Sequence, residues 1–351
     1  MPSSARSNLR FLLKGTLKIQ GAFFFASISM KIGVVGCGAV GSYYGAKLAR
    51  DGHEVHFLLR SDYEQVRRRG VLIKSPQGDF TIMPRCARSP QEIGRADLIL
   101  IALKTTANAE LESLLPPLVD ISTAVLTLQN GLGNEELLAR LFPPDQIMGG
   151  LCFVCLNRIS PGVIHHIDHG MVVLGEFQRW PEPRTHEIAA AFRHAGVPCK
   201  VTDNLARTHW EKLVWNIPFN GLGVASAAGL EALISENPDD PVSHDAPCLT
   251  TDKLLADPRW EKLVRELMLE VIATARGLEL PIDDSIADKQ IERTRTMGAY
   301  KASTLIDFER GQPLELEAIF LEPLRHAEKT GVPTPRLAAL CRVLQKLDQP
   351  G

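Results

Sequence analysis

The sequence predicts an α/β domain with a largely parallel sheet, followed by an all-helical domain. Up to about residue 203, short apolar runs bounded by polar residues alternate with amphipathic stretches, which is the pattern of βαβ units. Beyond that point the strand pattern fades, and long segments with helical spacing follow one another. A chain of 351 residues is also long enough to form two cores. We therefore expect domains at 30–202 and 203–347.

The segment from Met30 to Arg60 indicates the type of the first domain. An apolar run at 32–35 is followed by glycines with the spacing GxGxxG, then by a helix-forming stretch and a second strand at 54–59. Such glycines permit a tight turn, let the backbone approach a pyrophosphate and allow the helix to pack closely on the strand. The helix N-terminus then stabilises the phosphate charge. A glycine motif alone is weak, but the elements around it predict a Rossmann-type dinucleotide-binding domain.

We expect cofactor contacts from this turn and from the end of the second strand. In NAD-binding proteins that strand end usually carries an acidic residue for the ribose 2′-hydroxyl, but here it carries Arg60. A guanidinium can bind a 2′-phosphate through two charge-assisted hydrogen bonds, so we predict NADP(H). A solvated strand end is the alternative for Arg60. The turn residues expected to bind the cofactor are Gly36, Cys37, Gly38, Ala39, Val40 and Gly41.

Further strands are predicted at 97–103 and 124–128, and polar residues follow each of them. Lys104 follows the first strand, and Asn130 lies just beyond the second. Doubly wound sheets bind ligands at the carboxyl ends of their strands, so Lys104 and Asn130 are candidate site residues. The other elements expected in this domain are a hairpin at 71–82, helices at 134–141 and 187–194, and strand at 147–167 with a break at 160–162.

One helix of the second domain carries an unusual polar stripe. Lys212, Asn216 and Asn220 are spaced i, i+4 and i+8, so they share one helix face. Solvated faces commonly carry lysine, but asparagine is a mediocre helix former, and two of them favour a binding role. Pro218 is expected to kink this helix. The helices predicted for this domain are 205–219, 261–278, 286–308 and 315–329.

Composition narrows the range of functions. A formal net charge of −2 gives no basic excess for binding nucleic acid, so we expect a small-molecule partner. Seven scattered cysteines do not form a disulfide framework and indicate a reducing, cytoplasmic location. Cys152 and Cys155 form a CxxC, but in a predicted buried strand they point to opposite faces. The histidine-rich run 165–169 lacks further metal-ligand spacing, so no metal is expected.

The first 29 residues differ from the rest, being basic and serine-rich without any acidic residue. This composition alone fits a transit peptide, but its apolar stretch is too short for a membrane span, and we expect no membrane association. The plainer interpretation is a poorly ordered extension from an early start codon, with the domain proper beginning at Met30. The Pro- and Asp-rich run between Glu236 and Leu249 predicts an exposed loop. The sequence leaves the oligomeric state open, with a homodimer as one alternative.

Taken together, these residues resemble the ketopantoate reductase family, also called 2-dehydropantoate 2-reductases. The resemblance extends from Met30 to about Leu347, and the order of the matching motifs is more specific than any single one. The matching motifs are GCGAVG at 36–41, Leu59-Arg60, Leu103-Lys104, Asn130-Gly131, WEKLVWNIPFN at 210–220 and KASTLIDFERGQPLELEAI at 301–319. The last of these looks like the family's serine-aspartate-glutamate segment.

The resemblance implies NADPH-dependent reduction of 2-dehydropantoate to pantoate, a step toward pantothenate and coenzyme A. Lys212 would be the general acid, because a protonated amine can supply the carbonyl oxygen with a proton and stabilise the developing alkoxide. Amide side chains could hold the substrate without adding charge. The residues that the resemblance places around the substrate are Asn130, Asn216, Asn220, Ser303 and Glu315.

The resemblance also implies contacts to the cofactor outside the glycine-rich turn. Lys104 would face the cofactor, and Asn130 would lie between nicotinamide and substrate. Glu315 would lie beside both molecules. Cys155 falls where the family has a backbone contact to the cofactor.

The chain departs from the family pattern at several positions. Phe320 and Leu321 replace an Asn-Gly pair, Leu230 stands where the family commonly has another substrate-binding asparagine, and we interpret 239–245 as an insertion. These departures leave the hydride chemistry intact and the exact keto acid open. Two alternatives therefore remain, namely a related NADPH-dependent reductase of another branched 2-keto acid and a non-catalytic NADP(H)-binding regulator.

Overall fold

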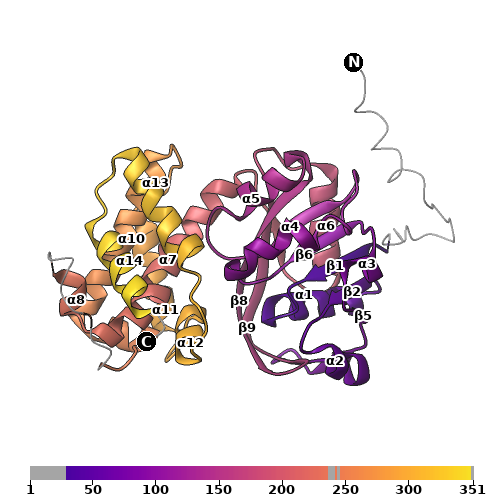
Figure 1. The fold of residues 1–351 in the computed structure, drawn as a ribbon. Coiled ribbons are helices and arrows are strands. Elements are labelled where there is room, and N and C mark those ends of the chain that lie inside the picture. Colours follow the sequence, from indigo (N-terminus) through magenta and orange to yellow (C-terminus); the bar gives the residue numbers. More distant parts are fainter. Residues whose placement is uncertain (1–28, 236–241, 243–245, 349–351) are drawn as a thin grey trace, which may run out of the picture. The chain divides into compact units, whose positions relative to one another are not determined.

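The structure is a computed structural model, and it describes residues 29–235, 242 and 246–348 (Figure 1). The predicted N-terminal extension, except for residue 29, and most of the predicted loop at 236–249 lie outside the described residues. The chain forms two compact units. Of the described residues, the first unit contains those up to Leu103 together with Ala109–Leu128 and Leu138–Asp203. The second contains Lys104–Asn108, Gln129–Leu137 and the described residues from Asn204 onward.

One mixed sheet of ten strands forms the centre of the first unit. The strands are β1 Lys31–Val35, β2 Glu54–Leu58, β3 Val71–Lys74, β4 Phe80–Ile82, β5 Arg85–Ala87, β6 Leu98–Ile101, β7 Ala124–Thr127, β8 Ile147–Ser160, β9 Val163–Glu176 and β10 Cys199–Val201. Their order is β4-β3-β9-β8-β7-β6-β1-β2-β5, and β10 pairs with β9. From β5 to β8 all neighbours are parallel, in the strand order of a Rossmann fold. The order reverses between β1 and β6, which is where such sheets bind dinucleotides.

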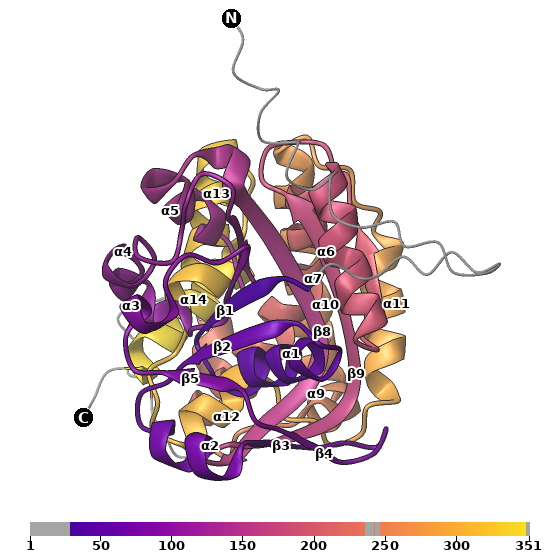
Figure 2. The same ribbon diagram turned by 90° about the vertical axis from the view of Figure 1, so that its right-hand side faces the viewer.

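The strands β8 and β9 form a long antiparallel hairpin that extends the sheet (Figure 2). Irregularities interrupt its register near Phe153 and Cys155. His169, close to these irregularities, has a positive φ of 64°. The predicted strand at 147–167 is thus two strands, and the second of them continues to Glu176.

Helices connect the strands, and apolar side chains fill the space between α1 and the sheet. The α-helices of this part are α1 Ala39–Arg50, α2 Tyr63–Arg69, α3 Pro90–Ile93, α4 Leu111–Leu114, α5 Asn134–Leu141 and α6 Pro183–His194. Tyr44 and Leu48 on α1 are fully buried, as are Ile32 and Phe57 on the sheet. Gly45 lets the helix approach, since an added Cβ would lie 2.8 Å from the ring of Phe57. Burial of these side chains stabilises the βαβ unit by roughly 1.5–3 kcal/mol for each large group.

The second unit is helical and is organised around α7, Leu205–Ala225, which packs against α10, α12 and α14. Its other elements are α8 Glu231–Ile234, α9 Thr251–Ala256, α10 Pro258–Gly277, α11 Ser285–Arg295, α12 Ser303–Glu309, a π-helical turn at Glu317–Leu321, α13 Glu322–Thr330 and α14 Pro335–Leu347. Val214 and Ile217 on α7 are fully buried in this core together with Leu267 on α10. None of the described helices is long and apolar enough to span a membrane.

Three helix predictions were wrong in their extent. The helix predicted at 205–219 continues through Pro218 to Ala225, because buried apolar residues surround its second half. The helix predicted at 286–308 is two helices, and Gly298 with φ +65° lies in the break. The helix predicted at 315–329 starts as the π-helical turn. The structure also adds α14, which the sequence analysis did not predict.

Candidate functional site

The glycine-rich turn after β1 can bring backbone close to a ligand. Gly36 has φ +103°. A Cβ there would lie 2.2 Å from the backbone nitrogen of Leu103, which lies just beyond the end of β6. Gly41 is held equally tightly, because its Cβ would lie 2.2 Å from the carbonyl oxygen of Gly36. At Gly38 a Cβ would meet nothing within 4 Å. Two glycines are therefore required for packing, and the third leaves its backbone accessible.

The start of α1 has the features of an anion site. Gly38 is the N-cap residue, so no side chain caps the helix, and the first turn contains no acidic residue. Ala39 and Val40 begin the helix and are half-buried. Because the first N–H groups of a helix lack intrahelical partners and carry partial positive charge, they favour a phosphate.

Arg60 follows β2 and pairs with a residue that the sequence analysis did not identify. Its guanidinium forms an ion pair with the carboxylate of Glu110. The side chain of Arg60 is 63% exposed and that of Glu110 is 41% exposed. The pair is thus open to solvent, where exchange for another anion costs little.

The two cysteines assigned to cofactor contacts differ in their surroundings. Cys37 lies in the glycine-rich turn, and its Sγ atom donates to the carbonyl oxygen of Val34 at 3.6 Å. Burial raises the pKa of the Cys37 thiol well above its usual value, so the thiol stays protonated. Cys155 is buried in β8, opposite Asp168 of β9. All seven cysteines of the chain are free thiols.

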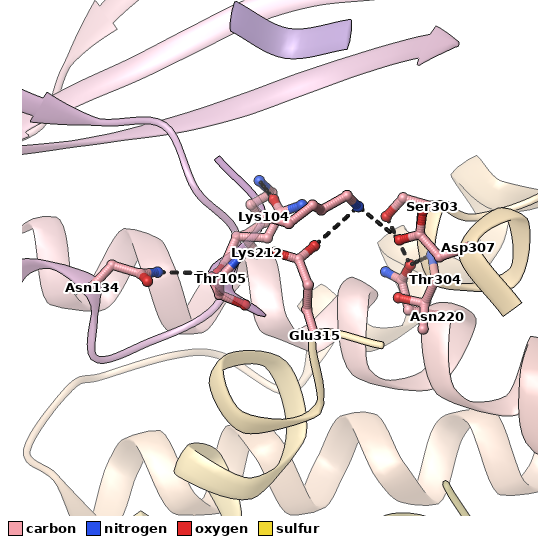
Figure 3. Close-up of polar contacts among 10 residues, drawn as sticks. Lys104, Thr105, Asn134, Lys212, Asn220, Ser303, Thr304, Asp307 and Glu315 are labelled. Carbon is pink, nitrogen blue, oxygen red and sulfur yellow. Dashed lines mark hydrogen bonds and ion pairs between the residues drawn. The ribbon is translucent and has the colours of Figure 1, made fainter. Parts of the chain in front are cut away.

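Lys104 joins two carboxylates of the helical unit. Its Nζ atom lies 2.7 Å from Asp307 and 3.1 Å from Glu315, and Glu315 also accepts from the backbone nitrogen of Thr105 at 2.8 Å (Figure 3). The side chain of Glu315 is only 4% exposed. Burial lowers the pKa of Lys104, but the attraction of Glu315 and Asp307 outweighs this effect and raises it overall. Burial raises the pKa of Asp307.

Lys212 and Asn130 are brought together by α7 and the segment after β7. The Nζ atom of Lys212 donates to Oδ1 of Asn130 at 2.8 Å. The turn at Asn130 depends on Gly131, which has φ +88°, and whose Cβ would lie 2.4 Å from the backbone of Ala318. The backbone nitrogen of Leu132 also donates to the carbonyl oxygen of Ala318 at 2.9 Å. These contacts fix the backbone that carries the Asn130 carboxamide.

The C-terminal half of α7 carries the side chains of Asn216 and Asn220, and Asn220 contacts α12. Oδ1 of Asn220 accepts from Oγ of Ser303 at 3.3 Å and from the backbone nitrogen of Thr304 at 3.1 Å (Figure 3). A backbone N–H can only donate, so this contact fixes the amide orientation and directs the Nδ2 donors elsewhere. Asn216 and Asn220 are both buried, which agrees poorly with a merely solvated helix face. The two asparagines of the stripe therefore lie within the protein, and Lys212 is half-buried.

Three of the departures from the family pattern are single residues that lie in or against the helical core, and the fourth, the predicted insertion at 239–245, lies outside the described residues except for residue 242. Phe320 is fully buried, and its ring limits the space at Gly221 of α7, where a Cβ would lie 2.9 Å away. Leu321 and Leu230 are partly buried and pack against the same core. These side chains contribute to packing.

Several polar residues of the site were missed by the sequence analysis. Asp307 belongs to the serine-aspartate-glutamate segment at 301–319 but was given no role there, although its spacing of four residues from Ser303 could have identified it. A chain of carboxamides joins the two segments that follow β6 and β7: Gln129 donates to Asn108 at 2.7 Å, Asn108 to Asn134 at 3.1 Å, and Asn134 to the carbonyl oxygen of Asn130 at 3.1 Å. Nothing in the sequence pattern indicated this chain. Within the described residues, no group of three or more His, Cys, Asp or Glu side chains could hold a metal ion.

Comparison with known proteins identifies the family. Residues 32–179 match the family model described as "Ketopantoate reductase PanE/ApbA", and residues 247–348 match its C-terminal counterpart. The chain belongs to the ketopantoate reductase family. The fold and the oxidoreductase class expected from the resemblance are thereby confirmed.

Individual relatives support the same assignment. A 2-dehydropantoate 2-reductase of Nostoc sp. is 40% identical over 324 residues, covering 91% of this chain and 95% of the relative. A 2-dehydropantoate 2-reductase structure from Geobacter metallireducens is 47% identical with a TM-score of 0.81, covering 90% of this chain and 98% of the other. A D-mandelate dehydrogenase structure with NADH and anilino(oxo)acetate shares the fold, with a TM-score of 0.77 at 20% identity. The match covers 91% of this chain and 98% of that one.

Proposed function

We propose that this reductase converts 2-dehydropantoate to pantoate with NADPH. The observation that carries the proposal is the placement of Lys212. Its amine donates to the Asn130 carboxamide, and the helix that carries Lys212, α7, also carries Asn216 and Asn220. We propose residues 30–202 as the cofactor-binding domain and residues 203–347 as the catalytic domain.

The chain's own residues fit a dinucleotide. The Gly38 side of the turn is open, and the uncapped N-terminus of α1 offers N–H groups to a pyrophosphate. Arg60 supplies a guanidinium for a 2′-phosphate, with Glu110 as its partner before binding. We assign further contacts to Cys37, Lys104 and Cys155, the last through its backbone. The bound cofactor would supply the hydride.

Lys212 has the chemistry of the general acid. Its protonated amine would donate to the carbonyl oxygen of the keto acid, and its charge would stabilise the alkoxide that forms there. The hydrogen bond to Asn130 restricts a side chain that otherwise has four flexible bonds. The ammonium is therefore oriented before the substrate arrives.

The remaining polar groups would hold the substrate and balance its charge. The Nδ2 donors of Asn220 can bind a carboxylate, with Asn216 beside them on the same helix face. The Ser303 hydroxyl can also bind it once its single proton turns from Oδ1 of Asn220 toward the substrate. The carboxylate of a buried Glu315 would repel this anion. Lys104 neutralises the charge of Glu315, and the backbone N–H of Thr105 donates a hydrogen bond to Glu315. Glu315 can then line the site without excluding a keto acid.

Turnover of NADPH with a panel of keto acids tests the proposal. We expect the highest kcat/KM with 2-dehydropantoate. Turnover of another branched 2-keto acid without turnover of 2-dehydropantoate would instead identify the related reductase. Binding of NADPH in a calorimeter without turnover of any keto acid would identify a non-catalytic NADP(H)-binding protein.

A further inference from the structure

His209 and Glu135 form a buried pair next to the site. Nε2 of His209 lies 3.0 Å from Oε1 of Glu135, and the two side chains are only 8% and 5% exposed. His209 belongs to α7, and Glu135 is the second residue of α5. Neither residue was assigned a role from the motifs or the resemblance.

This pair joins the same two segments as the Lys212–Asn130 contact. His209 precedes Lys212 by three residues on α7, so both side chains lie on one helix face a single turn apart. Glu135 follows Asn130 by five residues within the segment Gln129–Leu137. Two cross-links one helical turn apart fix both the distance and the register between α7 and this segment.

The carboxamide chain also fixes this segment. Asn134 donates to the carbonyl oxygen of Asn130 and accepts from Asn108 through its Oδ1 atom. Gln129 completes the chain by donating to Asn108. The segment that carries Asn130 is thus held by this chain as well as by the His209–Glu135 pair.

Stability alone is a weak reason for burying such a pair. Removing a carboxylate and an imidazole from water costs free energy that their attraction only partly returns, so apolar residues would serve a core equally well. Buried polar groups are best explained where they set a register. Here the register decides whether the Lys212 amine meets the Asn130 carboxamide, and an error of about 1 Å at a reacting group can cost roughly a hundredfold in rate.

We propose that Glu135 and His209 are positioning residues that hold Asn130 against Lys212. The catalytic consequence rests on the proposed role of Lys212 as general acid. The geometric part does not depend on it, because it concerns only the hydrogen bond between Lys212 and Asn130.

The test compares Glu135→Ala and Glu135→Gln in the full-length protein, with kcat, KM and the melting temperature as readouts. We expect Glu135→Ala to lower kcat about tenfold or more, with a small change in the KM for the keto acid. Glu135→Gln keeps an oxygen that can accept from His209, so it should recover most of the lost kcat. His209→Gln is the second variant if Glu135→Ala does not fold.

Two comparisons separate positioning from a general loss of stability. Glu270→Gln is the matched control, since Glu270 is a partly buried carboxylate of α10 that accepts from the backbone nitrogens of Arg336 and Leu337. It should lower the melting temperature and leave kcat unchanged. In an Asn130→Ala background, Glu135→Ala should cause no further loss of kcat, because the group it positions is already gone.

The inference is overturned if Glu135→Ala retains the kcat of the parent protein, or if its effect multiplies fully with that of Asn130→Ala. Should the parent protein reduce no keto acid, the proposed function fails, and a crystal structure of Glu135→Gln and Glu135→Ala decides the geometric part. The Lys212–Asn130 hydrogen bond should persist in the first variant and be lost in the second. Persistence in both would refute the positioning role.

Discussion

The Nζ atom of Lys212 lies 2.8 Å from Oδ1 of Asn130, so the amine of the helical unit is directed by an amide from the segment after β7. If Lys212 is the proton donor, Lys212→Met should lower kcat by about a hundred- to ten-thousandfold. The binding constant for NADPH should change little, because the glycine-rich turn and Arg60 remain. Steady-state kinetics and calorimetry measure the two quantities. Lys253→Met, an exposed lysine on α9, is the control and should retain full activity; an active Lys212→Met would remove this residue from the mechanism.

The Arg60–Glu110 pair predicts how the protein distinguishes its cofactors. Arg60→Ala should weaken NADPH binding about ten- to a hundredfold and leave NADH binding nearly unchanged, because only NADPH carries the phosphate that the guanidinium is proposed to bind. Glu110→Gln should have the opposite effect, tightening NADPH binding by a few-fold at most, since an exposed ion pair is worth at most about 1 kcal/mol. Fluorescence titration with both cofactors checks this. Equal losses for NADPH and NADH in Arg60→Ala would contradict the phosphate role.

Gly131 is a second position where a small change should have a large effect. It has φ +88°, and its Cβ would lie 2.4 Å from the backbone of Ala318, so Gly131→Ala combines strain with a clash. We expect a loss of about 2–3 kcal/mol in the free energy of unfolding, measured by urea denaturation, together with reduced kcat, because Asn130 is the neighbouring residue. Gly298→Ala is the matched control: its φ is also positive, at +65°, but a Cβ there meets nothing within 4 Å. If both substitutions cost the same, strain alone is sufficient and the contact with Ala318 does not matter.

The sequence predicted the Rossmann-type sheet because its cues are local. Glycine spacing, apolar runs and the polar residues after strands appear within a few tens of residues, and these cues indicated Gly36, Arg60, Lys104 and Asn130 as candidates. The stripe on α7 was also predictable, because helical periodicity places Lys212 and the two asparagines on one face. These predictions needed no knowledge of contacts between distant segments.

What the sequence did not reveal depends on pairing between distant residues. Glu110 lies 50 residues from Arg60, and Glu135 lies 74 residues from His209. No periodic pattern specifies which acid meets which base across such separations. The break between α11 and α12 was missed for a different reason, because apolar spacing continues across Gly298 while the backbone there adopts φ +65°.

His166 on β9 lies in a buried polar cluster of the sheet unit. Its Nδ1 atom lies 2.9 Å from Oγ of Ser75, and its Nε2 atom lies 3.0 Å from the carbonyl oxygen of His169. A carbonyl only accepts, so Nε2 carries the proton and Nδ1 accepts from the Ser75 hydroxyl. The ring also contacts that of Tyr43, with centroids 4.7 Å apart. This arrangement suits a neutral imidazole.

Burial lowers the pKa of His166 below its ordinary value of 6.5, with the positive charge of Lys47 acting in the same direction and contacts to His169 and Asp168 opposing it. The unfolded chain therefore takes up a proton near pH 6.5, while the folded protein does so only at lower pH. In that window the unfolded state binds more protons, so the free energy of unfolding falls as the pH falls through and below about 6.5, until the folded-state pKa is passed.

Removing the imidazole should reduce this pH dependence. His166→Gln is expected to lower stability at neutral pH by about 1–2 kcal/mol, through lost packing and hydrogen bonds. Its free energy of unfolding should then decline less steeply below pH 6.5 than that of the parent protein. Urea denaturation from about pH 5 to pH 8 measures both effects. In this variant the free energy of unfolding should still depend on pH to some extent, because burial also lowers the pKa values of His53 and His326. The control is His165→Gln, a substitution at the exposed neighbouring histidine, which should keep the pH dependence of the parent protein. If the free energy of unfolding of His166→Gln declines as steeply as that of the parent protein, His166 does not contribute to the acid sensitivity of the fold.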